Sequence, residues 1–168
     1  MRDQIIEYCE SETNIKDLFI NKKLDDCLLG ICHRLDESFT TAYDLNKIIA
    51  KIMKKDNLTY DEAIKDFNIN ILDKNPTISF ILATGENQDI LSDYNNKMLF
   101  LDGFEDNCLI GVRIKSGCNI VAAYDDSMCI QSLIEVDDMD EMDAVEFFEY
   151  NTRGSFVGND TPAIVTLF

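Results

Sequence analysis

Two Tyr-Asp pairs, Tyr43 with Asp44 and Tyr124 with Asp125, have side chains that could do chemistry. A phenol beside a carboxylate can bind a polar ligand or transfer a proton. Each pair also ends an apolar stretch and directly precedes a helix-like pattern, which suits the aspartate as a helix cap and the tyrosine as a buried residue. We favour this structural role. The alternative is a ligand site in which both pairs and Asn151 lie at the junction of two halves.

The other motifs point away from catalysis. His33 is the only histidine, and no serine or cysteine has a recognisable base beside it. Asp138, Asp140 and Glu149 match positions 1, 3 and 12 of a calcium-binding EF-hand loop, but Asp143 occupies position 6, where that loop requires glycine. We therefore expect no enzyme activity, no bound metal and no cofactor.

The cysteine pattern and the apolar pattern indicate the compartment. The six cysteines form no CxxC pair, and we expect them to be reduced and mostly buried. No run of about 18 apolar residues is present, and the start MRDQIIEYCESE lacks the regions of a secretion signal. These features predict a cytoplasmic protein that makes no membrane contact.

The Tyr-Asp pairs belong to a repeat with an offset of 81 residues. Positions 11–70 align without a gap on 92–151, and 17 of the 60 aligned pairs are identical. Unrelated sequences of ordinary composition would share roughly 4. We interpret the repeat as a tandem duplication with a first module at 1–83, a linker at 84–91 and a second module at 92–168.

Each module predicts the order β-β-α-α-β. The first strands are CLLGICHR and CLIGVRIK, and the second strands end in AYD. Thr59 and Glu62 have the spacing of a capping box for the second helix of the first module, and Asn70 and Asn151 are expected as left-handed C-caps. The final strands align PTISFIL on PAIVTLF, which implies five extra residues in the second module. Whether residues 17–20 and 98–101 form an additional short strand in each module stays open.

A module of this size buries little apolar surface by itself. We therefore expect the two modules to share a core or to extend one sheet about a pseudo-twofold axis. The predicted fold class is α+β, with two tandem modules packed as one compact body.

Charge separates the two halves. The formal net charge is -17, which argues against direct nucleic-acid binding and favours basic partners. Residues 1–84 contribute -4 and residues 85–168 contribute -13. Fifteen consecutive residues of the second module contain eight acids and no base: Glu135, Asp137, Asp138, Asp140, Glu141, Asp143, Glu146 and Glu149.

The helix from residue 141 is expected to bury Ala144, Val145 and Phe148 and to direct its acids to solvent. A solvated helix face would explain such a run. Like charges at this spacing cost stability, however, and therefore suggest a basic partner. Lysines 47, 51 and 54 on one side of a first-module helix leave open a homodimer in which they dock the acidic run.

The second module contains a spaced set of residues from its Tyr-Asp pair to its last strand: Tyr124, Asp125, Asp138, Met139, Ala144, Glu149, Tyr150, Asn151, Gly158, Thr161 and Pro162. Through these residues it resembles a family of small bacteriophage and prophage proteins, most of them uncharacterised, with the pattern YD … DGMT-EEA-E-EYN … G-TP. The resemblance covers about 65 residues and implies a phage or mobile-element setting, and therefore the cytoplasm of a host cell.

The acidic run and this setting together predict a non-enzymatic inhibitor of a host defence protein. It would occupy the nucleic-acid-binding surface of that protein, as DNA-mimic anti-CRISPR and anti-restriction proteins do. Two alternatives stay open. One is a module that binds or sequesters a nucleotide-like ligand, and the other is a phage structural or assembly protein.

Overall fold

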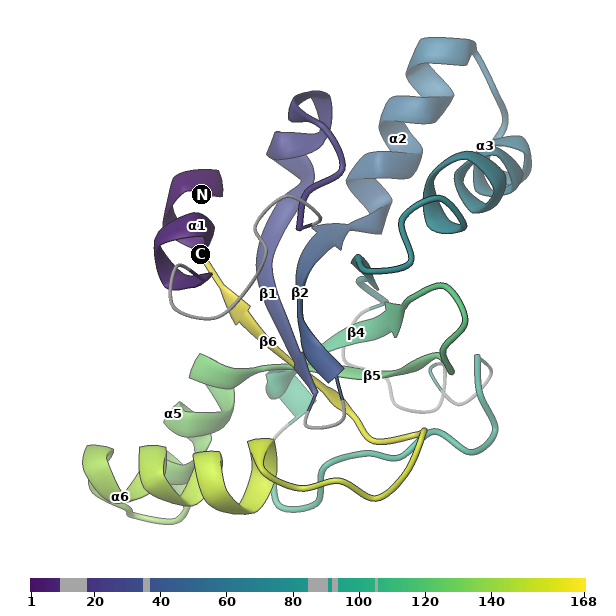
Figure 1. Cartoon of the computed structure of the whole chain (residues 1–168). Coiled ribbons are helices and arrows are strands. Elements are labelled where there is room, and N and C mark those ends of the chain that lie inside the picture. Colours follow the sequence, from purple (N-terminus) through teal and green to yellow (C-terminus); the bar gives the residue numbers. More distant parts are fainter. Residues whose placement is uncertain (10–17, 35–36, 85–90, 92–93, 105) are drawn as a thin grey trace.

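A closed barrel of six strands forms the centre of the computed structural model, which describes residues 1–9, 18–34, 37–84, 91, 94–104 and 106–168. The strands follow one another around the barrel in the order β1-β2-β3-β4-β5-β6. Helices α2 and α3 lie at one end of the molecule and α5 and α6 at the opposite end (Figure 1). The expected α+β class is confirmed.

The order of elements along the chain is β-β-α-α-β twice, preceded by one helix. None of the described helices has the length and apolar character needed to cross a membrane. The helices and helical turns are α1 (Arg2–Cys9), η2 (Lys22–Cys27), α2 (Leu45–Asp56), α3 (Tyr60–Phe67), η3 (Asn68–Leu72), η4 (Asp106–Cys108), α5 (Asp126–Val136), α6 (Glu141–Phe147) and η5 (Phe148–Arg153). The strands are β1 (Leu28–Arg34), β2 (Glu37–Asp44), β3 (Ser79–Leu82), β4 (Leu109–Ile114), β5 (Val121–Asp125) and β6 (Ala163–Leu167).

Side-chain caps begin the helices where the sequence predicts them. Asp44 accepts a hydrogen bond from Lys47 N at 3.0 Å, and Asp125 accepts from Ser127 N at 2.9 Å and Met128 N at 3.2 Å. The capping box of Thr59 and Glu62 is also present. These carboxylates and hydroxyls satisfy amides that have no partner within their own helix.

The two left-handed C-caps predicted from the sequence are wrong. Asn70 and Asn151 do not adopt left-handed C-cap conformations, because α3 and α6 continue into the π-helical turns η3 and η5. Among the described residues other than glycine, Asn57 and Asp138 have a left-handed backbone conformation. Residues 98–101 form no strand, and neither do residues 18–20.

The two halves close the barrel together. In each half the first two strands are antiparallel, with Leu28 opposite Tyr43 and Leu109 opposite Tyr124, and the second strand pairs parallel with the third. The seams β3–β4 and β6–β1 are antiparallel. The predicted shared body therefore forms by closure, which leaves neither half with a free sheet edge.

The pairing of the last strands corrects the alignment made from sequence. Tyr43 is opposite Phe80 and Tyr124 is opposite Ile164, so equivalent residues of β3 and β6 differ by 84 positions and not by 86. The second half therefore has three extra residues before β6. Strand side chains alternate with a period of two, so a shift of two residues leaves the same set facing the core. The apolar pattern could not detect the error.

Two glycines permit the close approach of strands at the seams. A Cβ at Gly30 would lie 1.8 Å from the carbonyl oxygen of Thr166 on β6, and a Cβ at Gly111 would lie 2.1 Å from that of Leu82 on β3. Gly111 also has a φ of +139°, which other residues rarely adopt. Barrel closure thus requires a residue without a side chain at each seam.

Buried apolar residues form one cluster at each end and one in the barrel. Tyr43 and Phe67 belong to the cluster beneath α1, α2 and α3, whereas Tyr124 and Phe148 belong to the cluster beneath α5 and α6. The third cluster consists mainly of small residues such as Ala123 and Ala163. Five of the six cysteines are buried and Cys118 is exposed, and all are free thiols.

Candidate functional site

The eight acids predicted as a partner-binding surface are all exposed at the α5–α6 end of the molecule. We call this set the acidic face. Glu135 lies in the last turn of α5, and Asp137 and Asp138 follow that helix. Asp140 caps α6 by accepting hydrogen bonds from Met142 N and Asp143 N. Three more acids lie on α6 itself and Glu149 lies in η5.

Almost none of this charge is neutralised within the described residues. Arg153 contacts Glu149 at 2.5 Å, and this is the ion pair that the described structure gives to the acidic face. Glu135 accepts a hydrogen bond from Gln131 at 2.6 Å, a neutral partner. The remaining carboxylates stay close to one another in solvent, where their mutual repulsion favours a cationic partner.

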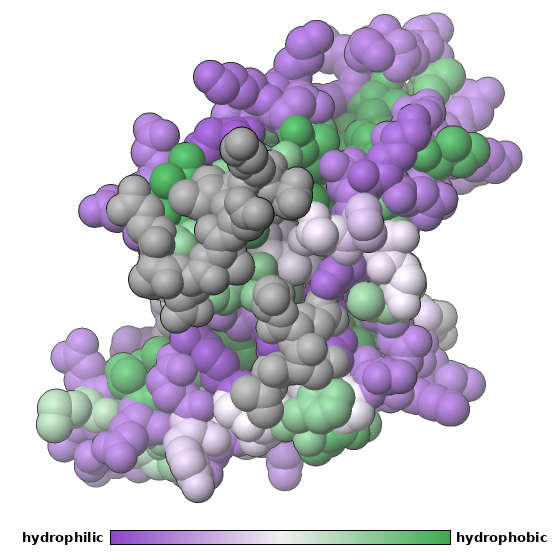
Figure 2. Space-filling view, viewed as in Figure 1, coloured by the Kyte–Doolittle hydropathy of each residue, from purple (hydrophilic) through white to green (hydrophobic). Residues whose placement is uncertain are grey.

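Apolar side chains are exposed among these acids. Met142 is 80% exposed and Tyr150 82%, and Val136, Val145 and Phe147 are each at least 40% exposed. Ala144 and Phe148 are buried as predicted, but the predicted burial of Val145 is wrong. Figure 2 shows apolar side chains interspersed with hydrophilic ones at this end. A partner can therefore gain apolar burial as well as charge pairing here.

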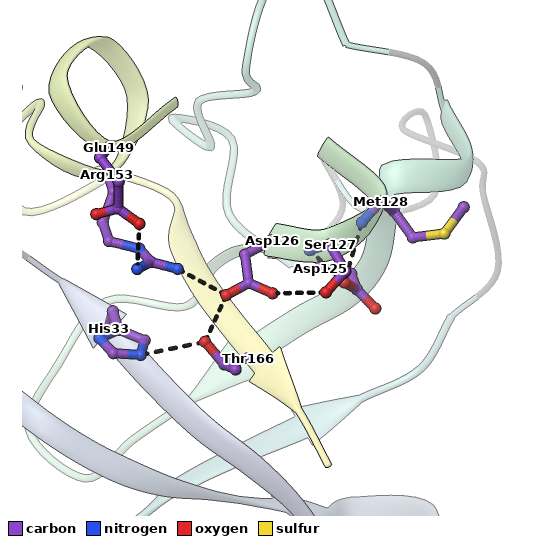
Figure 3. Close-up of polar contacts among 8 residues, drawn as sticks. All are labelled: His33, Asp125, Asp126, Ser127, Met128, Glu149, Arg153 and Thr166. Carbon is purple, nitrogen blue, oxygen red and sulfur yellow. Dashed lines mark hydrogen bonds and ion pairs between the residues drawn. The ribbon is translucent and has the colours of Figure 1, made fainter. Parts of the chain in front are cut away.

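A polar network fixes the acidic face to the barrel (Figure 3). Asp126, the first residue of α5, accepts a hydrogen bond from Arg153 Nη2 at 2.6 Å and another from the hydroxyl of Thr166 on β6. Arg153 also holds Glu149 and lies over the Phe148 ring. Side chains of η5 and β6 thus both bind the carboxylate of Asp126 on α5. These contacts hold the helices that carry the acidic face in a defined position.

The network reaches the first half through His33 on β1. Its Nε2 lies 3.3 Å from Thr166 Oγ1. The single hydroxyl proton of Thr166 goes to Asp126, which only accepts, so His33 must donate its Nε2 hydrogen to Thr166. Burial first, and the positive charge of Arg153 second, lower the pKa of His33 to about 4, although Asp126 acts in the opposite direction.

This donor order does not activate a nucleophile. In a Ser-His-Asp triad the imidazole takes the hydroxyl proton and the carboxylate orients the imidazole. Here His33 donates to the hydroxyl, and the carboxylate of Asp126 is already engaged by Arg153. The geometry is that of a structural hydrogen-bond chain across the β6–β1 seam.

This network was not predicted from the sequence, and the equivalent positions of the other half show that the barrel does not require it. The residues that occupy the equivalent positions are all apolar and pack against the first-half cluster: Leu45, Leu72, Leu82 and Ile114. The exchange of Leu45 for Asp126 was visible in the alignment of 11–70 on 92–151, whereas Leu72 and Arg153 lie two residues beyond its end. The position equivalent to Thr166 could be identified only with the correct register of β6, which the strand pairing supplies.

The Tyr-Asp pairs have structural roles. Tyr43 is 0% exposed and its hydroxyl accepts a hydrogen bond from Ile20 N at 3.2 Å, while Tyr124 is 1% exposed and accepts from Leu101 N at 3.2 Å. The tyrosines belong to different clusters, so the structure does not bring them together in one ligand site. Burial raises the pKa of Asp125, and the two amides that it caps act against this shift.

Asn151 is exposed and lines a cavity of about 320 Å³ between residues 99–104, η5 and the segment before β6. Leu101, whose amide binds the Tyr124 hydroxyl, lines the same cavity. Asp44 and Asp125 have their carboxylates directed to the helix amides that they cap. The alternative ligand site predicted from both Tyr-Asp pairs and Asn151 is therefore not formed as one site, because its five residues are divided over two ends of the molecule.

Within the described ranges, no three His, Cys, Asp or Glu side chains are grouped so that they could hold a metal ion. The predicted linker at 84–91 lies mostly outside the described residues. Comparison of the chain with protein-family models, with curated proteins and with solved structures finds no match.

Proposed function

We propose that this protein is a non-enzymatic inhibitor that uses the acidic face to occupy the nucleic-acid-binding surface of a basic host defence protein. The observation that carries the proposal is the acidic face itself, eight exposed carboxylates with one described ion pair. A surface that binds polyphosphate presents lysines and arginines, for which exposed carboxylates are the complementary charge. The phage-like pattern of the second module fits a protein that acts inside a host cell.

The exposed apolar residues also support a protein partner. Met142 and Tyr150 are each at least 80% exposed within the acidic face. Charge pairs at the rim of an interface speed association, whereas buried apolar and aromatic anchors supply most of the affinity. The network around Asp126 keeps this surface rigid, which lowers the entropy lost on binding.

The test begins with affinity capture from a bacterial lysate and identification of the captured protein, followed by measurement of its Kd. Glu141→Gln, Asp143→Asn and Glu146→Gln together remove three charges without touching the α6 cap or the Glu149 ion pair. We expect this variant to bind about 100-fold more weakly at low salt, which corresponds to roughly 1 kcal/mol for each desolvated charge contact.

The matched control carries Asp3→Asn, Glu7→Gln and Asp61→Asn, which remove the same charge from exposed positions outside the acidic face. It should bind as tightly as the parent, and the parent should displace nucleic acid from the partner. Equal affinity of parent and neutralised variant would overturn the proposal, as would equal losses in both variants, because general charge and not this surface would then be responsible.

We also infer that the two halves arose by duplication of one β-β-α-α-β unit. The inference is supported by the equivalent pairings of Tyr43 and Tyr124, the aspartate caps that follow both tyrosines, and the glycine at each seam. The halves would then have diverged, with the acidic face restricted to the second.

A further inference from the structure

The first half carries a groove that is lined by lysines, in contrast to the acidic face of the second half. Its volume is about 740 Å³. It lies between η2, the C-terminal half of α2, and the turn from α3 into η3, at the end of the molecule opposite the acidic face (Figure 1). Four lysines line it: Lys23, Lys51, Lys54 and Lys55. The whole chain has only 15 basic residues and a net charge of -17, so this concentration of cations is local.

These lysines differ in how far they are already neutralised. Lys51 contacts Asp26 at 2.7 Å, and Lys55 lies 3.3 Å from Asp56. Lys23 and Lys54 are exposed and form no ion pair with the described residues. Among the described residues, these two ammonium groups have no anionic partner that an incoming anion would have to displace.

The floor of the groove is apolar. Ile52 is buried, and the half-buried Leu24 and Ile71 pack against the first-half cluster. Asn21, Asp66 and Asn70 add hydrogen-bonding groups at its edge. A ligand that fits these walls has an anionic part, a flat or apolar part, and polar groups that can donate to a carboxylate.

The second half has the same order of elements, but its described residues do not repeat the lysines of the groove. Phe104 takes the place of Lys23 and packs edge-to-face on Phe148, with ring centroids 6.2 Å apart. Ser132, Glu135 and Val136 stand where the first half has Lys51, Lys54 and Lys55. The lysine groove is therefore a specific feature of the first half and not a consequence of the fold.

We propose that this groove binds a nucleoside phosphate, with the phosphates on Lys23 and Lys54 and the base on the apolar floor. Lysine is an effective point-charge partner for phosphate, and pockets of roughly 300–1,000 Å³ hold ligands of this size. Amino and hydroxyl groups of the nucleoside can donate to Asp66. A nucleic-acid polymer does not fit, because its remaining phosphates would face a strongly acidic protein.

The test is isothermal titration of the full chain with ATP, GTP and inorganic triphosphate in magnesium-free buffer. We expect saturable binding of at least one nucleotide, with triphosphate about 10-fold weaker or more, because it lacks the part that covers the apolar floor. Lys23→Gln with Lys54→Gln should weaken nucleotide binding by about 10-fold or more.

The control is Lys22→Gln with Lys65→Gln, which removes the same charge from exposed positions on η2 and α3 outside the groove lining. It should bind nucleotide with the parent's Kd. The proposal is overturned if neither nucleotide binds, if both lysine variants lose affinity equally, or if triphosphate binds as tightly as ATP and GTP.

This proposal is independent of the acidic face. The variant neutralised at Glu141, Asp143 and Glu146 should therefore bind nucleotide as the parent does. Conversely, the Lys23 and Lys54 variant should keep its affinity for a basic partner protein. Failure of one proposal leaves the other unaffected.

Discussion

Arg153 Nη2 lies 2.6 Å from Asp126 Oδ2, and the side chains are only 20% and 9% exposed. This pair occupies positions where the first half has Leu72 and Leu45. We expect Arg153→Leu alone to lower the free energy of unfolding by about 3 kcal/mol, because it leaves the Asp126 carboxylate buried without its cation.

The double variant Asp126→Leu with Arg153→Leu should recover most of that loss, because apolar pairs often replace buried ion pairs at little cost. Urea unfolding of the parent, both single variants and the double variant measures the coupling. A double variant that loses the sum of the two single changes would show that the residues do not act as a pair.

His33 should make the protein less stable in mild acid. Its folded-state pKa of about 4 lies below the ordinary value of 6.5, so between these values the unfolded chain binds more protons than the folded protein. The stability is fully present above pH 6.5 and is lost as the pH falls through about 4.

The loss should be on the order of 2 kcal/mol relative to His33→Gln, which keeps a donor for Thr166 but does not titrate. Unfolding free energies at pH 7 and pH 4.5 measure this difference. NMR gives a direct check, because the chain has one histidine, and a ring resonance that titrates near pH 6.5 would contradict the half-buried, neutral state.

Glycine at the barrel seams should be far less replaceable than glycine in turns. Gly30→Ala and Gly111→Ala each place a methyl group against a backbone carbonyl that cannot move without opening the seam. We expect a loss of about 3 kcal/mol or more for each. Gly103→Ala has no atom within 4 Å of the new Cβ, and its φ of +84° should cost only about 1 kcal/mol. Equal losses in urea unfolding would contradict the seam contacts.

Charge repulsion on α6 should be relieved by Glu146→Lys. Lys65 occupies the equivalent position in the first half, and the new lysine would lie three residues after Asp143. We expect a gain of about 0.5 kcal/mol at low salt, because one repulsive pair becomes attractive. The gain should shrink in 0.5 M salt through screening. Thermal unfolding at both salt concentrations measures it, and a gain that salt leaves unchanged would have another origin.

The short-range features of this protein were determined by its sequence. The caps of Asp44 and Asp125, the buried tyrosines, the element order and the location of the acidic face were all predicted. Each depends on hydrogen bonds or side-chain periodicity within about four residues, and such interactions are read directly from neighbouring positions. The exposure of Val145 shows the limit of such predictions. The periodicity of a helix indicates which side is buried, but not how wide a stripe of that helix the neighbouring elements cover.

Barrel closure, the register of β6 and the polar network were decided only by tertiary structure. They join residues as distant as His33 and Thr166, and a two-residue slip of a strand preserves its apolar pattern while changing every partner. The lysine groove has the same origin, because η2 and the α3–η3 turn reach α2 only when the first-half cluster packs. Residue types are local information, whereas the side chains that meet one another depend on how distant strands pair.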